Sequence, residues 1–489
     1  MKKKYLILLS VVVIGIAAAV MASIWGHRNT HGNTIPKDAR AIAMFDLRKL
    51  ATEADLSLQE QQQFVNRLLQ MEVDLRELGL DLRQPIYGFA TQEGNFGAVS
   101  VVSDKDNLET LLTRLHERGS VSELTHQRGY AWATVAQQWL LCIDNSKVML
   151  MGPAVGSAQD QLRSQMVRLM EQDYDDSGMQ LPVFSKLTEQ DEPLTVIADA
   201  QLIPADWRDE LCKALNVEQL NDVQLLLGID ADENRVDIDA DLITERPDVK
   251  ERLQRLDDLL RPIEGSLIER AHSSGLLWMA CNMEGTKLVE LLRQHPDVRT
   301  ALLGLNMMVD ADQMLMAING DVTLELTDLA FLLGWSQQPS VRLMAELKNM
   351  DFLEQRDYWL QSAAKQSAYG LTAEGEGFCL TANGMTAWFG ASDDVLYAAS
   401  THDLGTVERA LEVNRFLEEE RDDICDTRLF VTLDMRPLAA VGRLFGGDNL
   451  LGKLRLFQRM NIEMKEPGSF EMTLLAPEGK NLAKSLLLK

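Results

Sequence analysis

Four short apolar runs in the sequence each end at an aspartate or an asparagine: Asp46, Asp199, Asn282 and Asp434. Carboxylates that are held close together with unequal pKa values can act as a general acid and a general base. Asp and Asn between a strand and a helix are also favoured N-cap residues, which accept hydrogen bonds from amides of the first helical turn. Because an asparagine cannot act as a general acid, the pattern favours capping. The sequence therefore assigns no catalytic residue.

The string from Asp230 to Asp241 begins like a calcium-binding loop. Such a loop needs a glycine at its sixth position and a bidentate glutamate at its twelfth, but Arg235 and Asp241 occupy these positions. Apolar residues at 236, 238, 240 and 242 alternate with aspartates at 237, 239 and 241, and this period of two is typical of a strand. We therefore expect a hairpin with a solvated row of aspartates, and no stabilisation by calcium.

Histidines, cysteines and glycine motifs also indicate no site. The seven histidines include no pair at the helical spacing of zinc ligands, and the chain has no Walker loop, no G-x-S-x-G motif and no dinucleotide fingerprint. The cysteines form no C-x-x-C pair and have apolar neighbours, which predicts buried free thiols: Cys142, Cys212, Cys281, Cys379 and Cys425. The sequence predicts no cofactor and assigns no cofactor-binding or metal-ligating residue.

The elements that must position these residues recur along the chain. A strand, a cap and a helix start are predicted from Ala41–Phe45 onward, and the same order returns after residues 194–198, 276–281 and 429–433. In the closest pair, Asp46-Leu47-Arg48-Lys49-Leu50 matches Asp434-Met435-Arg436-Pro437-Leu438. A proline suits the first turn of a helix, so the match supports a helix start at both places.

A second recurrence extends the similarity. Capping-box patterns at Asp106–Glu109 and Asp351–Glu354 each open a predicted helix. Three strands follow each helix, at residues 130–135, 139–143 and 148–151, and at residues 378–382, 386–389 and 395–398. Trp139 and Trp388 each stand five residues before an aspartate at a turn. With Trp278, they could line a ligand groove, but tryptophans on alternating strands are more typical of a core.

These patterns predict an α+β fold with two duplicated halves of antiparallel sheets and strand-cap-helix units, preceded by one N-terminal apolar helix. The predicted parts are the apolar segment at 1–26, a linker at 27–34, a first half at 35–265 and a second half at 266–489. Each half closes with a hairpin, at residues 223–243 and 454–475. We expect the halves to superpose with Trp139 over Trp388.

The N-terminus predicts export. Three lysines follow Met1, and the 21 residues from Tyr5 to Trp25 carry no charge. A helix of about 20 apolar residues crosses the hydrocarbon core of a membrane, and positive charge stays on the cytoplasmic side. The segment is either a signal-anchor or a signal peptide cut after Val20-Met21-Ala22, a fair match to a cleavage site. We favour an anchor in the inner membrane with a periplasmic or otherwise extracytoplasmic body, which would be secreted if the segment is cleaved.

The charge of the chain restricts its partners. The formal net charge is −26, and the basic residues are interspersed among more numerous carboxylates. Nucleic acid is an unsuitable partner, because binding to phosphates requires clustered Lys and Arg. Apolar residues make up 46% and charged residues 25% of the chain, as in ordinary globular proteins. The partners that we expect are the membrane, through the N-terminal segment, and an unidentified protein, glycan or small molecule.

The opening of the body resembles a family. Ile35-Pro36-Lys37-Asp38-Ala39, the apolar strand and Asp46–Leu50 are similar to the start of an uncharacterised family of Bacteroidetes-type cell-envelope proteins, known only as a domain of unknown function. The resemblance implies a location in the cell envelope and brings no catalytic residues. Members often look like lipoproteins, whereas this sequence has no cysteine at the end of its apolar segment.

Two function classes remain. The first is a non-enzymatic binding or structural protein of the cell envelope, which the absence of any catalytic signature favours. The alternative is an envelope hydrolase with a carboxylate-based site that forms only in the fold, because sequence spacing does not reveal such a site.

Overall fold

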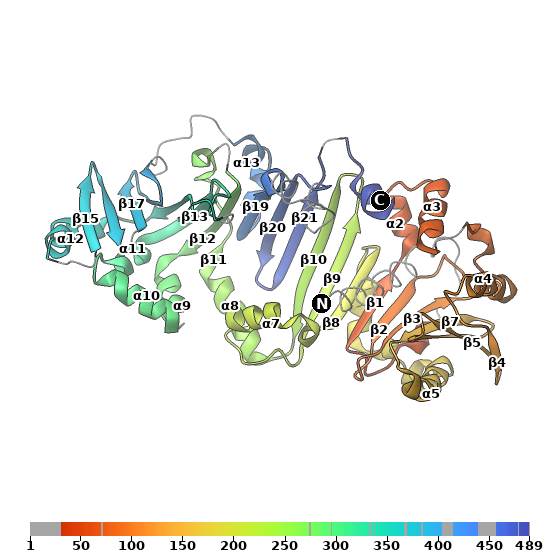
Figure 1. Cartoon of the computed structure of the whole chain (residues 1–489). Coiled ribbons are helices and arrows are strands. Elements are labelled where there is room, and N and C mark those ends of the chain that lie inside the picture. Colours follow the sequence, from red (N-terminus) through yellow and green to blue (C-terminus); the bar gives the residue numbers. More distant parts are fainter. Residues whose placement is uncertain are drawn as a thin grey trace. The chain divides into compact units, whose positions relative to one another are not determined.

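The computed structural model describes residues 31–69, 72–272, 275–294, 296–331, 334–336, 338–365, 369–382, 385–402, 414–438, 456–477 and 479–488. The predicted signal-anchor at residues 1–26 lies outside the described residues. The chain divides into two compact units. Unit 1 runs to Pro247 and also contains Glu478–Lys489, and unit 2 is Asp248–Pro477. Figure 1 shows the elements of both units.

Unit 1 is built on an antiparallel sheet with the strand order β4-β5-β6-β7-β3-β2-β1-β8-β9-β10. Its strands are β1 Ala41–Phe45, β2 Ile86–Ala90, β3 Phe96–Val101, β4 Thr125–Gln127, β5 Tyr130–Val135, β6 Trp139–Ile143, β7 Lys147–Gly152, β8 Leu194–Asp199, β9 Val223–Ala231 and β10 Arg235–Thr244. The sheet runs through the predicted strand-cap-helix strands β1 and β8, which are neighbours.

Helices cover both faces of this sheet. They are α2 Leu47–Glu53, α3 Leu58–Leu69, α4 Lys105–Glu117, α5 Gln159–Met170, α6 Pro182–Glu189, α7 Ala205–Leu215 and α17 Leu482–Leu488, with the 3-10 helix η1 His31–Thr34. Because side chains alternate along a strand, β7 contributes Met149 to the core under α5 and α6, and Val148 to the core under α4. Figure 1 shows α4 and α5 on opposite sides of this part of the sheet.

Unit 2 has the strand order β15-β16-β17-β18-β14-β13-β12-β19-β20-β21. Its strands are β11 Leu260–Arg261, which pairs with the end of β12, and then β12 Leu277–Glu284, β13 Ile318–Leu326, β14 Val341–Leu347, β15 Tyr369–Glu374, β16 Gly377–Ala382, β17 Met385–Ser392, β18 Val395–Ala399, β19 Leu429–Asp434, β20 Arg459–Glu466 and β21 Ser469–Leu475. If β1 to β10 are matched in chain order with β12 to β21, the two sheets have the same strand order.

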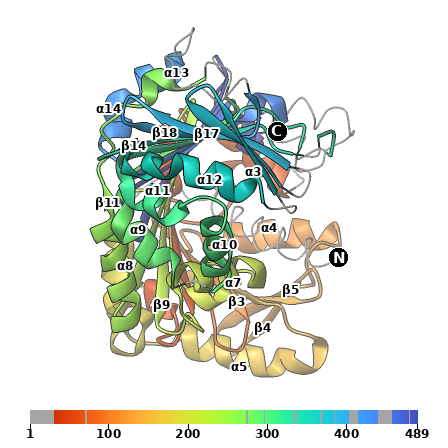
Figure 2. The same ribbon diagram turned by 90° about the vertical axis from the view of Figure 1, so that its left-hand side faces the viewer.

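The helices of unit 2 are α8 Pro247–Leu259, α9 Gly285–Leu292, α10 Pro296–Asn306, α11 Ala311–Ala317, α12 Arg356–Ala363, α13 Arg415–Glu419 and α14 Arg421–Cys425. One face of the sheet packs Phe378 and Phe389 against Trp359 of α12. The other face packs Trp278 and Phe430 against α13 and α14. Figure 2 shows α11 and α12 on one side of the sheet and α13 and α14 on the other.

The antiparallel α+β fold that the sequence predicts is confirmed, and β1 has the predicted bounds. Two local predictions are wrong. The chain is already folded at His31, inside the predicted linker, because η1 is buried against Tyr87. The helix expected to open at Asp106 begins earlier, because Asp104 caps it and accepts a hydrogen bond from the amide of Asn107 at 3.0 Å.

When the units are aligned on Asp46 and Asn282, the pairing register matches Gly97 of β3 with Arg342 of β14. This register corrects the expected match of Trp139 with Trp388. In unit 1, the residue of β7 that pairs with Gly97 of β3 pairs on its other side with Leu140. In unit 2, the residue of β18 that pairs with Arg342 of β14 pairs on its other side with Trp388. Trp388 therefore stands where unit 1 has Leu140, one residue after Trp139. A shift of one residue moves a side chain to the other face of a sheet.

The predicted hairpin from 223 to 243 is confirmed as β9 and β10. Its aspartates do not all lie in solvent. Asp237 is only 8% exposed, lies opposite Asp230 and pairs with Nε of Arg235 at 2.8 Å. The alternation of apolar and acidic residues correctly predicted the strand, but it did not predict how exposed the aspartate face of that strand is.

Candidate functional site

Three of the four recurring side chains are caps, as predicted. Asp46 accepts hydrogen bonds from the amides of Arg48 at 3.0 Å and Lys49 at 3.1 Å, in the first turn of α2. Asp199 accepts one from the amide of Gln201 at 3.0 Å. Asp434 accepts one from the amide of Arg436 at 2.9 Å. Bonds of this kind satisfy amides that have no partner within their own helix.

The prediction for Asn282 is wrong. Strand β12 continues past it to Glu284, because β11 pairs with Asn282 and Met283 after the last residue that pairs with β19. The side chain of Asn282 is fully buried, donates to Oδ1 of Asp321 at 3.0 Å and accepts from Nε of Arg261 at 2.9 Å.

Within each unit, the two recurring side chains lie at opposite ends of a strand pair. Asp46 and Asp199 lie at opposite ends of the antiparallel pair formed by β1 and β8. Asn282 and Asp434 are separated in the same way along β12 and β19, because the amide of Asp434 bonds to the carbonyl of Leu276. An acid and a base for one reaction must both reach the same substrate, so the two residues of each unit do not form a catalytic pair.

The sequence did not reveal a buried polar cluster on the sheet of unit 2. Asp321 and Glu325 of β13 and Arg342 of β14 are 1%, 2% and 7% exposed. Oε2 of Glu325 accepts from Nε and Nη2 of Arg342 at 3.0 and 2.7 Å. On β13 these polar residues alternate with apolar ones, so the pattern cannot be distinguished from that of a solvent-facing strand.

The cluster holds the chain segment at residues 263–272 against the sheet. Asp321 accepts hydrogen bonds from the amides of Glu264 at 2.9 Å and Ser266 at 3.1 Å. Glu325 accepts one from the amide of His272 at 2.6 Å, and Arg342 donates to the carbonyl of Arg270. All four carboxylate oxygens therefore have protein partners, which suits a structural role.

Unit 1 has apolar residues at the matching positions. By register, Phe89 stands where unit 2 has Glu325, and Gly97 stands where it has Arg342. A Cβ at Gly97 would collide with the ring of Phe89. The space between the two strands is thus filled in unit 1 by the ring of Phe89 over Gly97, on β2 and β3. In unit 2 the ion pair of Glu325 and Arg342, on β13 and β14, fills the matching space.

Unit 1 contains a carboxylate with an unusual environment. Burial, together with the neighbouring carboxylate of Asp230, raises the pKa of Glu53 to about 7, although Lys49 opposes this effect. Lys49 is itself paired with Asp191. A carboxyl group with such a pKa can exchange protons near neutral pH. Among Glu53, Asp230 and Asp191, Glu53 is therefore the residue best suited to acid-base chemistry.

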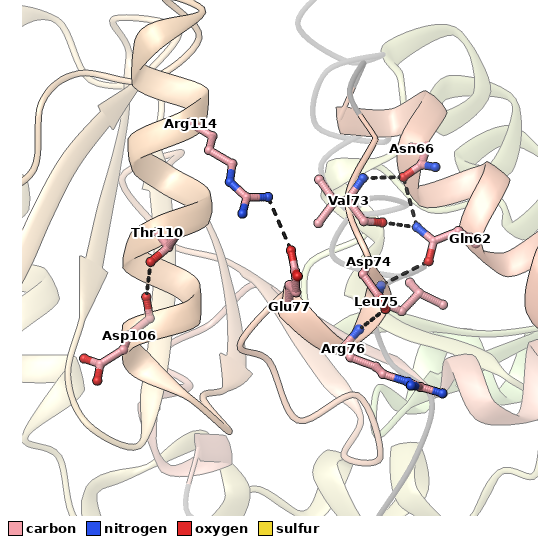
Figure 3. Close-up of polar contacts among 10 residues, drawn as sticks. All are labelled: Gln62, Asn66, Val73, Asp74, Leu75, Arg76, Glu77, Asp106, Thr110 and Arg114. Carbon is pink, nitrogen blue, oxygen red and sulfur yellow. Dashed lines mark hydrogen bonds and ion pairs between the residues drawn. The ribbon is translucent and has the colours of Figure 1, made fainter.

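A polar contact network between α3 and the chain after it is structural. Figure 3 shows Gln62 and Asn66 of α3 pointing at the backbone of the segment that follows the helix. Asn66 accepts from the amide of Val73 at 2.8 Å, and Gln62 accepts from the amide of Leu75 at 3.1 Å. These side chains satisfy the backbone of a segment that belongs to no strand.

A groove between α8 and α9 is the concave candidate in unit 2. It has a volume of about 260 Å³ and is lined by Arg255, Asp258, Leu259, Lys287, Glu290, Leu291 and Gln294. The α9 residues recur at spacings of three and four, so they share one helix face. This spacing is visible in the sequence, but the partner helix that makes the face a groove is not.

The histidines, cysteines and tryptophans named by the sequence analysis lie as follows in the described ranges. No group of three or more His, Cys, Asp or Glu residues there could hold a metal ion. The five cysteines are free, and burial raises the pKa of both Cys142 and Cys281 to about 12. Trp139 and Trp278 are buried, as predicted, whereas Trp388 is half-buried and donates to Glu374 at 3.0 Å. Among the described residues, no helix has the length and the apolar character needed to cross a membrane.

Comparisons with known proteins give a family and a distant structural similarity. Residues 31–435 match a family described as a domain of unknown function (DUF4836). No curated protein matches the chain. Crystal forms IV and I of TP0453 are 13% and 14% identical to the chain, each with a TM-score of 0.29. They cover 44% and 48% of this chain, which corresponds to 81% and 89% of theirs.

Proposed function

The chain belongs to the family of the domain of unknown function DUF4836, and on this basis we propose that it is an exported, membrane-anchored binding protein of a Bacteroidetes-type cell envelope. The three lysines and the uncharged run before residue 26 support the anchor and the export. The ligand is a protein, glycan or small molecule outside the cytoplasm, and the charge of −26 argues against nucleic acid.

The observation that carries this proposal is the groove between α8 and α9. Five of its seven lining residues are charged or polar and two are leucines, so this concave surface suits a ligand with charged groups and a small apolar part. The buried carboxylates Asp321 and Glu325, in contrast, have all their oxygens bound by the protein. Unit 2 thus offers a place for a ligand rather than free catalytic groups.

Cell fractionation tests the export and the anchor. We expect the full-length protein in the membrane fraction, with its body digested by protease added from the non-cytoplasmic side. Recovery of the intact protein from the cytoplasm would refute the proposal. A mature N-terminus at Ser23 would instead show that the segment is a cleaved signal peptide.

We also propose that the two units arose by internal duplication. The supporting observation is the shared strand order, in which β1 to β10 match β12 to β21. If a solved structure of the chain showed different strand orders in the two units, this support would be lost.

A hydrolase remains the second candidate, and Glu53 with Asp230 is its best location because the pKa of Glu53 is raised to about 7. Incubation with envelope glycans and peptides tests it. A hydrolytic activity that disappears in Glu53→Gln but persists in Glu60→Gln would favour the enzyme. Absence of turnover, with ligand binding retained in Glu53→Gln, would favour the binding protein.

A further inference from the structure

Two guanidinium groups share one neutral acceptor at the groove between α8 and α9. Oε1 of Gln294 accepts from Nη1 of Arg252 at 2.7 Å and from Nη1 of Arg255 at 3.3 Å. A carboxylate adds a full negative charge and offers two oxygens to guanidinium groups, whereas the amide of Gln294 offers one neutral oxygen. A carboxylate is therefore a better acceptor for these arginines than the amide that they hold.

Lys287 adds a third positive charge to the same surface. Its Nζ donates to the carbonyl of Asp258 at 2.9 Å, at the end of α8, and pairs with Glu284 at 3.2 Å. These contacts tether the lysine to the wall of the groove. Nη2 of Arg255 also pairs with Glu251 at 2.6 Å, and the carboxylate of Asp258 lines the groove together with Arg255 and Lys287. The groove therefore presents basic and acidic groups side by side, which suits a ligand that carries both charges.

Acidic and apolar groups restrict which anion fits. Glu290 lines the groove and has no hydrogen-bond or ion-pair partner among the described residues. Its carboxylate repels a second negative charge and attracts an ammonium group. Leu259 is buried and Leu291 is half-buried, so the groove also has an apolar surface. A volume of about 260 Å³ limits the ligand to a small molecule or to one end of a peptide.

We propose that the groove binds a small zwitterion of the amino-acid or short-peptide type, with one carboxylate, one ammonium group and an apolar side chain. This inference rests on the proposed function, because it names the ligand class of the same groove. The ligand carboxylate replaces Oε1 of Gln294 between Arg252 and Arg255. The ammonium group pairs with Glu290, and the apolar side chain packs on Leu259 and Leu291.

Calorimetric titration of the full-length protein in detergent tests the ligand class with three probes. They are L-leucine, leucinamide, which lacks the carboxylate, and N-acetyl-leucine, which lacks the ammonium group. We expect L-leucine to bind, and each analogue to bind at least about tenfold more weakly, the effect of one lost hydrogen bond between charged groups.

Variants locate the binding. Arg255→Gln should weaken binding of L-leucine about tenfold while leaving the weak binding of leucinamide unchanged, because leucinamide has no carboxylate to lose. Glu290→Gln should reduce the preference for L-leucine over N-acetyl-leucine. Arg76→Gln, at an exposed residue of unit 1, should change neither value. The melting temperature of each variant verifies that it is folded.

Two outcomes separate the inference from the proposed function. If none of the three probes binds while an extract of envelope metabolites still shifts the leucine methyl signals of the groove, the zwitterion is wrong and the binding protein stands. If neither the probes nor the extract perturbs the groove, both are wrong. Equal binding of L-leucine and leucinamide would overturn the role of Arg252 and Arg255.

Discussion

Asp46 directly follows β1, whereas Asn282, its match in unit 2, lies within β12, and the two side chains bind different partners. Asp46 bonds to amides of a helix, and Asn282 bonds to Asp321 inside a sheet. The sequence correctly predicted the end of β1 and the cap, because the cap depends on residues within one turn. It could not predict β11, which extends β12 from a separate part of the chain.

Asp46→Ala should lower the free energy of unfolding of unit 1 by about 0.5–2 kcal/mol, since two amides of α2 lose their acceptor. Asp46→Asn keeps an acceptor and should cost less. Urea denaturation with a probe in unit 1 measures both changes. Equal losses in the two variants would show that the charge of Asp46, rather than capping, stabilises the helix.

His31 makes unit 1 sensitive to acid. Burial lowers the pKa of His31 from 6.5 to about 4, more than its hydrogen bond to the carbonyl of Pro85 raises it. On acidification, the unfolded chain therefore binds a proton at His31 near pH 6.5, whereas the folded unit binds it only near pH 4. The stability that depends on neutral His31 should be complete above pH 6.5 and decrease as the pH falls toward 4.

In His31→Gln, this part of the pH dependence of the urea midpoint should disappear between pH 6.5 and 4. His126→Gln is a matched control, because the side chain of His126 is 61% exposed. If His126→Gln flattened the profile and His31→Gln did not, the assignment to His31 would be wrong.

At the scale of the element, β20 carries a carboxyl group, Glu463, that makes unit 2 more stable at acidic pH. Burial raises the pKa of Glu463 to about 7, and the charges of Glu471, Asp423 and Glu420 add to this effect against Lys465. Glu471 lies directly across from it on β21, and like charges at such a pair are destabilising.

The folded unit 2 keeps a proton on Glu463 that the unfolded chain loses near pH 4.5. Its stability should therefore decrease as the pH rises from 4.5 to 7, the reverse of the His31 effect. Hydrogen exchange of residues 415–425 in α13 and α14 should accelerate over the same range, after correction for the intrinsic rate. Glu463→Gln should abolish this response, whereas Glu466→Gln, on the exposed end of β20, should retain it.

The ion pair between β13 and β14 gives a fourth test. Arg342→Met leaves Glu325 buried without its partner and should cost about 3–5 kcal/mol. Glu325→Phe with Arg342→Gly copies the solution of unit 1 and should recover much of that loss. Lys213→Met, at an exposed pair, should cost at most about 1 kcal/mol. A double variant as unstable as Arg342→Met would mean that the two solutions are not interchangeable.

At the scale of the whole molecule, the sequence predicted the antiparallel fold because alternation and turns are local signals. It placed Trp388 one residue out of register with unit 1, because register is set by pairing across strands. The groove was beyond prediction for the same reason. Its lining comes from α8 and α9, and their packing against each other is a tertiary property.

The central claim is that the chain is a binding protein whose ligand occupies this groove. Methyl NMR of the full-length protein in detergent, with labelled leucines, tests it most directly during titration with small molecules extracted from the cell envelope. The account predicts shifts centred on Leu259 and Leu291 that are reduced in Arg255→Gln. Shifts centred instead on Leu50, near Glu53, or the absence of any shift, would contradict it.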